Sequence, residues 1–173
     1  MSILGVVLAG GQSRRFGRDK ALEPLAGRPL IGHALAALAG CAAVAVAGRD
    51  WPGVLSLPDR PAAGLGPLGG LNAALHHAAA HRFSHVASLP VDTLGLPADW
   101  LARLGLDGGP AHAVGQPLVG IWPVTLHDNL ADYLAGGGRR VQAWVAGTGA
   151  VPIALGPLLN VNCPADLPQQ IKG

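Results

Sequence analysis

Short apolar runs recur along the chain and end at glycine or proline. The first, from Ile3 to Ala9, contains no polar side chain and stops at Gly10 and Gly11. Such a run is typical of a strand that is buried on both faces of a parallel sheet. Comparable runs predict further strands at residues 42–47, 54–57, 85–89 and 158–161.

The segments between these runs have the composition and the boundaries of helices. Pro29 suits a first helical turn, and the Ala- and Leu-rich segment that follows it extends to about Gly40. Other helices are predicted at residues 69–82 and 127–135, and after Arg139 and Pro164. Strands that alternate with helices predict an α/β fold, a Rossmann-like three-layer α/β/α arrangement around a doubly wound, mostly parallel sheet.

Length and composition are those of one folded domain. The chain has 173 residues, and domains usually contain about 100 to 200 residues, so residues 1–173 are expected to form a single domain. Only 13% of the residues are charged and 50% are hydrophobic, which excludes charge-driven disorder. The net charge is only +2, and we see no basic tail, so nucleic acid is not an expected partner.

The compartment expected for this chain is the cytoplasm. Cys41 and Cys163 are too few for a disulfide scaffold and lack the spacing of a zinc knuckle. The run from Ile3 to Ala9 is not preceded by the basic residues of a secretory signal. Residues 30–48 carry no acidic residue, lysine or arginine, but they fit a helix, a turn and a strand better than a membrane span, so no membrane contact is expected.

The loop after the first predicted strand contains the residues best suited to chemistry. Residues 8–22 read LAGGQSRRFGRDKAL, with three glycines, three arginines and a lysine. Glycines allow backbone N–H groups to converge on an anion, and Lys and Arg neutralise phosphate charge. The spacing is neither that of a Walker A loop nor that of a dinucleotide-binding loop. From the residues alone, a nucleotide phosphate loop and a solvated glycine-rich turn both remain open.

This loop resembles the signature of a known family. The run from Leu8 to Lys20 is similar to the Leu-Ala-Gly-Gly-x-Ser-x-Arg-Met-Gly-x-Asp-Lys motif of nucleotidyltransferases, most closely the molybdenum cofactor guanylyltransferases of the MobA type, with Phe16 in place of Met. Four more segments resemble that family in the same order: LPDRPAAGLGPLGGL at 57–71, LPVDTLGLP at 89–97, GQPLVGIWP at 115–123 and LLNVNCPADL at 158–167.

The resemblance implies an activity and a set of site residues. The activity is a Mg²⁺-dependent transfer of GMP from GTP to molybdopterin, with release of pyrophosphate. Lys20 matches the phosphate-binding lysine and Arg15 the accompanying arginine, and Asp92 matches the metal ligand. The remaining implied contacts are Leu8, Ala9, Gly10 and Gly11 with guanine and ribose, Asp59 with the guanine nucleotide, and Asn160 and Asn162 on the pterin or metal side. A molybdoenzyme or an insertion chaperone is a further candidate partner.

Several alternatives stay open. Gly48 and Arg49 occupy the place where the family often has an Asn in the guanine site. Asp92 also suits a turn, and the two Asn residues suit a helix cap. Arg139 and Arg140 fit either a pterin phosphate contact or a plain turn into a helix.

The function has alternatives as well. These are a cytidylyl- or sugar-phosphate nucleotidyltransferase of the same superfamily, and a nucleotide-binding regulator without turnover. His77 and His81 are four residues apart and would share a helix face, but no metalloprotease pattern accompanies them, so a histidine metal site is not expected.

Overall fold

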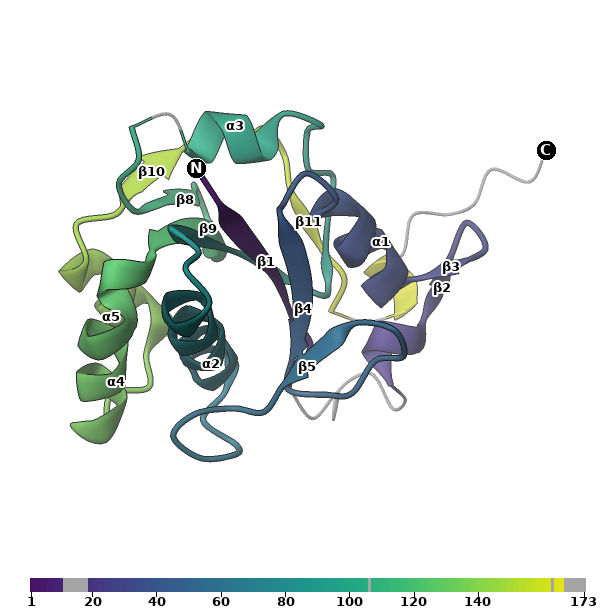
Figure 1. Cartoon of the computed structure of the whole chain (residues 1–173). Coiled ribbons are helices and arrows are strands. Elements are labelled where there is room, and N and C mark those ends of the chain that lie inside the picture. Colours follow the sequence, from purple (N-terminus) through teal and green to yellow (C-terminus); the bar gives the residue numbers. More distant parts are fainter. Residues whose placement is uncertain (11–18, 106, 163, 167–173) are drawn as a thin grey trace.

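The computed structural model describes residues 1–10, 19–105, 107–162 and 164–166 (Figure 1). Within these ranges the main sheet has seven strands in the order β10-β8-β9-β6-β1-β4-β5. The strands are β1 (Ile3–Leu8), β4 (Ala43–Ala47), β5 (Leu55–Leu57), β6 (His85–Pro90), β8 (Ala111–Ala113), β9 (Gln116–Pro123) and β10 (Val151–Ile153).

Strand direction confirms the predicted sheet. β1 pairs in parallel with β4 and with β6, β4 pairs in parallel with β5, and β8 pairs in parallel with β10. β9 is antiparallel to both of its neighbours, β6 and β8. The sheet is therefore mostly parallel, with one reversed strand.

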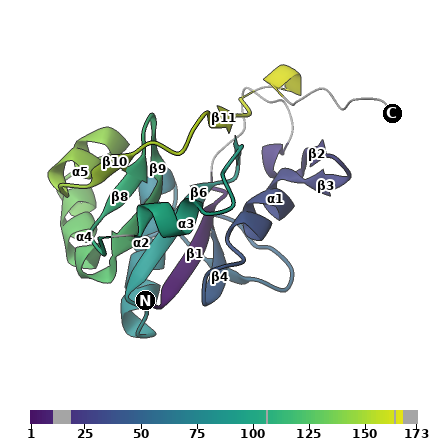
Figure 2. The same ribbon diagram turned by 90° about the horizontal axis from the view of Figure 1, so that it is seen from above.

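Helices cover both faces of the sheet, as Figures 1 and 2 show. Alternate residues of a strand point to opposite faces. Accordingly, Leu4, Val6 and Leu8 belong to one buried cluster, and Val7 belongs to the other. The first cluster includes α2 (Pro67–Ala80), α4 (His127–Ala135) and α5 (Val141–Gly147), and the second includes α1 (Leu30–Ala37) and α3 (Trp100–Leu104). This is the expected three-layer α/β/α arrangement.

Small elements connect these layers. Two ribbons of two strands each lie outside the main sheet, β2 (Pro24–Leu25) with β3 (Arg28–Pro29) and β7 (Thr93–Leu94) with β11 (Leu159–Asn160). Short 3₁₀ turns are η1 (Lys20–Leu22), η2 (Val124–Leu126) and η3 (Pro164–Asp166).

β1 is the point from which successive strands of the chain are added first on one side of the sheet and then on the other. The chain continues from β1 to β4 and β5 on one side, and then crosses through α2 to β6 on the other side. Leu8, at the end of β1, is in register with Ala47 of β4 and with Pro90 of β6. The loops after three strands therefore leave the same edge, at the kind of switch point where doubly wound sheets bind ligands.

Two predicted elements differ from the structure. The strand expected at 158–161 is present as β11, but it pairs with β7 and not with the main sheet. The Val161 N–H donates to the Asp92 carbonyl at 2.9 Å, which ties this segment to the loop after β6. Where a helix is expected after Pro164, the structure has the 3₁₀ turn η3, and the residues after Asp166 lie outside the described part of the chain.

The uncharged segment 30–48 forms α1, a turn and β4, as predicted. Over the described residues, none of the helices combines the length and the apolar character that a membrane crossing requires.

Gly48 is where two loops of the sheet edge touch, and this contact is testable. Its φ is +85°, and a Cβ at this position would lie 2.3 Å from the Gly10 Cα. Gly53 has a similar φ of +74° but open space around it, so it is a matched control. We expect Gly53→Ala to cost about 1–2 kcal/mol for the left-handed backbone alone. Gly48→Ala is expected to cost about 3 kcal/mol or more, because the backbones must also separate. Urea unfolding measures both, and equal losses would show that the two loops are not in contact.

Candidate active site

A cavity of about 1120 Å³ lies at the carboxyl edge of β1, β4 and β6. Leu8, Ala9 and Gly10, at the end of β1, are among the residues that line it. A second cavity, of about 810 Å³, is lined by Asp59, Gly64 and Gly66 from the loop between β5 and α2. The residues common to both linings are Gly10, Gly48 and Arg49, so the two cavities adjoin at this point.

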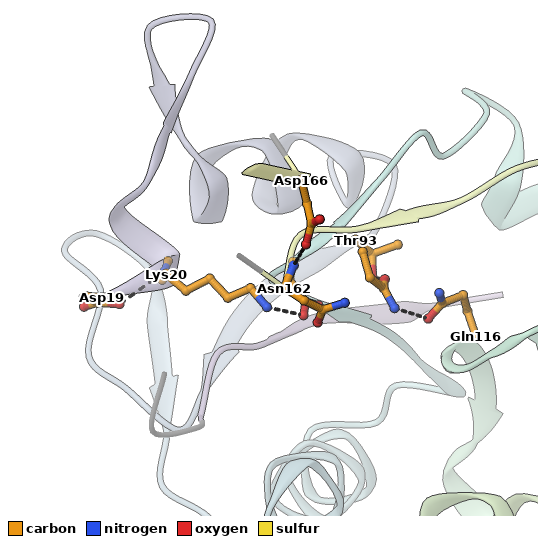
Figure 3. Close-up of polar contacts among 9 residues, drawn as sticks. Asp19, Lys20, Thr93, Gln116, Asn162 and Asp166 are labelled. Atoms are coloured by element: carbon orange, nitrogen blue, oxygen red, sulfur yellow. Dashed lines mark hydrogen bonds and ion pairs between the residues drawn. The ribbon is translucent and has the colours of Figure 1, made fainter. Parts of the chain in front are cut away.

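A lysine and an aspartate form an ion pair in the larger cavity. Lys20 Nζ donates to Asp92 Oδ2 at 2.8 Å (Figure 3), and their side chains are 16% and 23% exposed. Asp92 follows β6 by two residues, and Lys20 begins η1 in the loop that follows β1. The parallel pairing of β1 with β6 therefore brings together two residues that are 72 positions apart.

A second ion pair lies beside the first. Arg49 donates from Nη1 to Asp19 Oδ1 at 2.8 Å and from Nη2 to Asp19 Oδ2 at 2.7 Å. The hydrogen bonds from Arg49 lower the pKa of the Asp19 carboxyl and outweigh the opposite effect of burial, and the same contact raises the pKa of Arg49. Both groups are therefore charged across the physiological pH range.

A chain of hydrogen-bonded side chains includes two residues that line the larger cavity, Gln116 and Asn160. Thr93 Oγ1 donates to Asn160 Oδ1 at 3.3 Å, and Asn160 Nδ2 donates to Gln116 Oε1 at 3.0 Å (Figure 3). This order fixes the orientation of both amides. Because its oxygen is already an acceptor, Gln116 presents its amide N–H groups as the donors for a ligand.

Two carboxylates line the smaller cavity, the exposed Asp50 and the partly buried Asp59. Burial raises the pKa of Asp59, and a hydrogen bond from the Gly64 backbone partly offsets this effect. Asp59 also packs against α2, since Cβ atoms built on Gly69 and Gly70 would lie 3.2 and 3.6 Å from its side chain. The contact is tight at Gly69, where the missing side chain makes room for Asp59, whereas 3.6 Å at Gly70 is an ordinary van der Waals distance.

Most of the predicted site residues come together, and two fall outside the described part of the chain. Leu8, Ala9, Gly10, Lys20, Asp92 and Asn160 line the larger cavity, and Asp59 lines the smaller one. Gly11 and Arg15 lie outside the described residues.

Asn162 and Arg139 have other contacts. Asn162 is exposed and is not among the residues that line the cavity, and its backbone N–H donates to Asp166 Oδ2 at 2.7 Å. In this contact Asn162 contributes its backbone and not its side chain, so it does not show Asn162 as a helix cap. Arg139 donates to the Leu134 and Gly138 carbonyls, whereas Arg140 lines the cavity.

The sequence motifs indicate no function for Gln116. Arg49 stands out in the sequence only because the family often has an Asn at this place. Gln116 is the first polar residue of the GQPLVGIWP segment, so the motif contained a signal. Arg49 followed a strand end, which is where site residues were expected. In the described ranges, no group of three or more His, Cys, Asp or Glu residues is arranged to hold a metal.

Comparison with known proteins places this geometry in context. The MobA-like NTP transferase domain profile matches residues 5–149. The Rhodobacter capsulatus molybdenum cofactor guanylyltransferase is 38% identical over 96% of this chain and 94% of its own. The enzyme of the same name from Acidiphilium cryptum is 40% identical over 94% of this chain and 90% of its own.

Solved structures share the fold. Molybdopterin-guanine dinucleotide biosynthesis protein A from Archaeoglobus fulgidus superposes with a TM-score of 0.74 at 21% identity, covering 95% of this chain and 94% of that one. The 2-C-methyl-D-erythritol 4-phosphate cytidylyltransferase from Thermus thermophilus gives 0.72 at 18% identity, covering 96% and 95%. At these identities the likeness concerns the fold.

The Asp19–Arg49 pair predicts a pH-dependent contribution to stability. A carboxyl whose folded-state pKa is lowered stabilises the fold above its ordinary pKa of about 3.9, and this contribution disappears as the pH falls through the lower folded-state value. At pH 7 we expect Asp19→Asn to lose about 0.2–1 kcal/mol, as is usual for exposed pairs, since Asn still caps η1. Urea unfolding at pH 7 and pH 3 should show that the difference from wild type narrows in acid. In an Arg49→Met background, Asp19→Asn should no longer change the stability. A change that persists in this background would have a cause other than the ion pair.

Proposed function

Because the chain belongs to the MobA-like NTP transferase family, we infer that it transfers GMP from GTP to the molybdenum cofactor and releases pyrophosphate. Relatives named for this activity match almost the whole chain. The observation that supports it most strongly in the structure is the Lys20–Asp92 pair at 2.8 Å, in a cavity that adjoins a second one. Two adjoining cavities suit a reaction that joins two large substrates.

In this proposal the smaller cavity receives the base of GTP. Guanine presents two adjacent donors, N1–H and the 2-amino group, and the Asp59 carboxylate has two oxygens that accept. Cytosine presents one donor beside two acceptors, which a carboxylate does not match. Asp59 therefore favours guanylyl over cytidylyl transfer. The ribose and the α-phosphate then reach Gly10, where the cavities adjoin.

Lys20 stabilises the charge that develops during the reaction. The acceptor phosphate attacks the α-phosphorus, the bond to the bridging oxygen breaks, and negative charge accumulates on the departing pyrophosphate. An ammonium group that is already held at a partly buried position offsets this charge. Arg15, by resemblance, adds a second positive charge to the same phosphates.

The donor set around Asp92 fits Mg²⁺. This cation is usually bound by one or two carboxylates, with water and substrate phosphates completing its shell. Asp92 supplies a carboxylate in a cavity that Asn160 also lines, and among the described residues no larger cage competes with it. Bound here, Mg²⁺ would hold the attacking and leaving oxygens in line and neutralise part of their charge.

The end of the larger cavity that contains Gln116, Arg140 and Asn160 is the proposed place of the molybdopterin. Arg140 contributes positive charge for its phosphate, and the two amides contribute hydrogen bonds to its polar edges. Handover of the product to a molybdoenzyme or an insertion chaperone remains part of the proposal. So does a cytoplasmic location, which the free thiol of Cys41 supports.

The direct test of this function is pyrophosphate release with each nucleoside triphosphate, with and without molybdopterin. We expect release with GTP, dependent on molybdopterin and on a divalent cation. Equal turnover with CTP would favour the cytidylyltransferase alternative. Binding of GTP without turnover, under any acceptor and metal condition, would favour the nucleotide-binding regulator.

Asp92→Asn separates a metal ligand from a turn residue. If Asp92 binds Mg²⁺, Asn keeps an oxygen but loses the charge, so kcat should fall by about 10²-fold and recover in part at high Mg²⁺. Binding of Mn²⁺, followed by electron paramagnetic resonance, should weaken in parallel. Asp99→Asn is the matched control, because Asp99 is exposed and its side chain makes no capping hydrogen bond. Near-normal turnover of Asp92→Asn at low Mg²⁺ would assign Asp92 to the turn.

If the Asp59 carboxylate binds guanine, the affinity for GTP should depend on pH and on the donors that the base presents. Its raised pKa means that the carboxyl takes up a proton at a higher pH than an ordinary Asp, so GTP affinity should begin to fall earlier in acid. ITP lacks the 2-amino group and should bind about 10-fold or more weakly than GTP, because a charged acceptor loses its donor. Asp59→Asn should bind GTP and ITP alike, with little pH dependence. Retained discrimination in this variant would place the base elsewhere.

A further inference from the structure

Arg49 lies where the two cavities adjoin, yet its guanidinium is directed at a protein carboxylate. Both Nη groups bond Asp19, at 2.8 and 2.7 Å, in the fork geometry that makes arginine–carboxylate pairs specific. Its Nε is buried and has no hydrogen-bond partner within the part of the chain that the structure describes. The described polar contacts of this side chain are therefore made with Asp19.

Asp19 has a second task in the same place. Its Oδ1 also accepts from the Ala21 N–H at 3.1 Å and so caps η1. Ala21 is buried, which fixes the turn against the core. One carboxylate therefore binds the loop after β4 and sets the start of the turn that presents Lys20.

Lys20 depends on this turn for its position. A lysine side chain is flexible. The position of its ammonium group is therefore defined only if the backbone of the lysine is itself held in place. Here the neighbouring Asp19 is tied to Arg49, and the Lys20 carbonyl accepts from the Glu23 N–H at 3.2 Å. With its backbone fixed on both sides, Lys20 donates to Asp92 at 2.8 Å, and both residues line the larger cavity.

We propose that Arg49 and Asp19 form a positioning pair that holds Lys20 in place for phosphate binding and catalysis. This assignment rests on the proposed function, and it extends the site to the loop after β4. Gly48, whose backbone packs against Gly10, places Arg49 within reach of Asp19. The pair accounts for an arginine at a position where the family resemblance offered no role.

The test compares Arg49→Met in two backgrounds. In the wild-type background we expect kcat/KM for GTP to fall by about 10-fold to 100-fold, as displacement of a catalytic group by about 1 Å can do. In a Lys20→Ala background we expect Arg49→Met to cause no further loss, because it acts through Lys20. Arg49→Lys should recover only part of the activity, since an ammonium cannot make the paired contact. Arg28→Met, on the exposed β2–β3 ribbon, controls for the loss of one positive charge.

Two results would overturn the proposal. One is a wild-type kcat/KM for GTP in Arg49→Met. The other is an equal loss of kcat/KM in the wild-type and Lys20→Ala backgrounds, which would mean that Arg49 acts on the fold or on the base site. Should Arg49→Met fail to fold, Asp19→Asn gives the same comparison, because Asn keeps the cap and loses the charge. Equilibrium binding of GTP is measured alongside turnover. A wild-type protein that binds GTP without turnover would contradict the proposed function, while the affinities of the same variants would still decide the role of the pair.

Discussion

The parallel pairing of β1 with a strand on each side is the constraint on which the site depends. Leu8 is in register with Ala47 and with Pro90, so the loops after β1, β4 and β6 leave one edge together. The loop after β1 carries Asp19 and Lys20, the loop after β4 carries Arg49, and the loop after β6 carries Asp92. Gly48 is required at the crossing of two of these loops, because a Cβ there would overlap the Gly10 backbone. The cavities thus follow from strand order and register before any side-chain chemistry is considered.

Charge at this edge is arranged in pairs. Lys20 lies against Asp92 and Arg49 lies against Asp19, so two cations are each paired with an anion, and of these four groups Asp19 is exposed and the other three are partly buried. Such an arrangement stabilises charged groups where isolated ones would be costly. It also puts a candidate phosphate-binding cation and a candidate metal ligand in direct contact. A triphosphate and its cation have the charges to engage both members of that pair, which is why the Lys20–Asp92 contact is central to the proposed chemistry.

The sequence predicted those parts of the structure that depend on local pattern. The apolar run of β1, the helix at 127–135 and the placement of Lys20 and Asp92 after strands all follow from neighbouring residues. β8 and β10 were missed because three residues each are too few to show a period. The Arg49–Asp19 and Asn160–Gln116 contacts join residues 30 and 44 positions apart, so they depend on strand order and on the separate β7–β11 ribbon. No local pattern contains that information. The roles of individual site residues remain predictions.

The most direct measurement is a crystal structure with a non-hydrolysable GTP analogue and Mn²⁺, whose anomalous signal locates the cation. The account predicts guanine in the cavity beside Asp59, phosphates against Lys20 and the Mn²⁺ peak at the Asp92 carboxylate. A nucleotide whose base lies beside Gln116 and Arg140, or a cation bound away from Asp92, would contradict it.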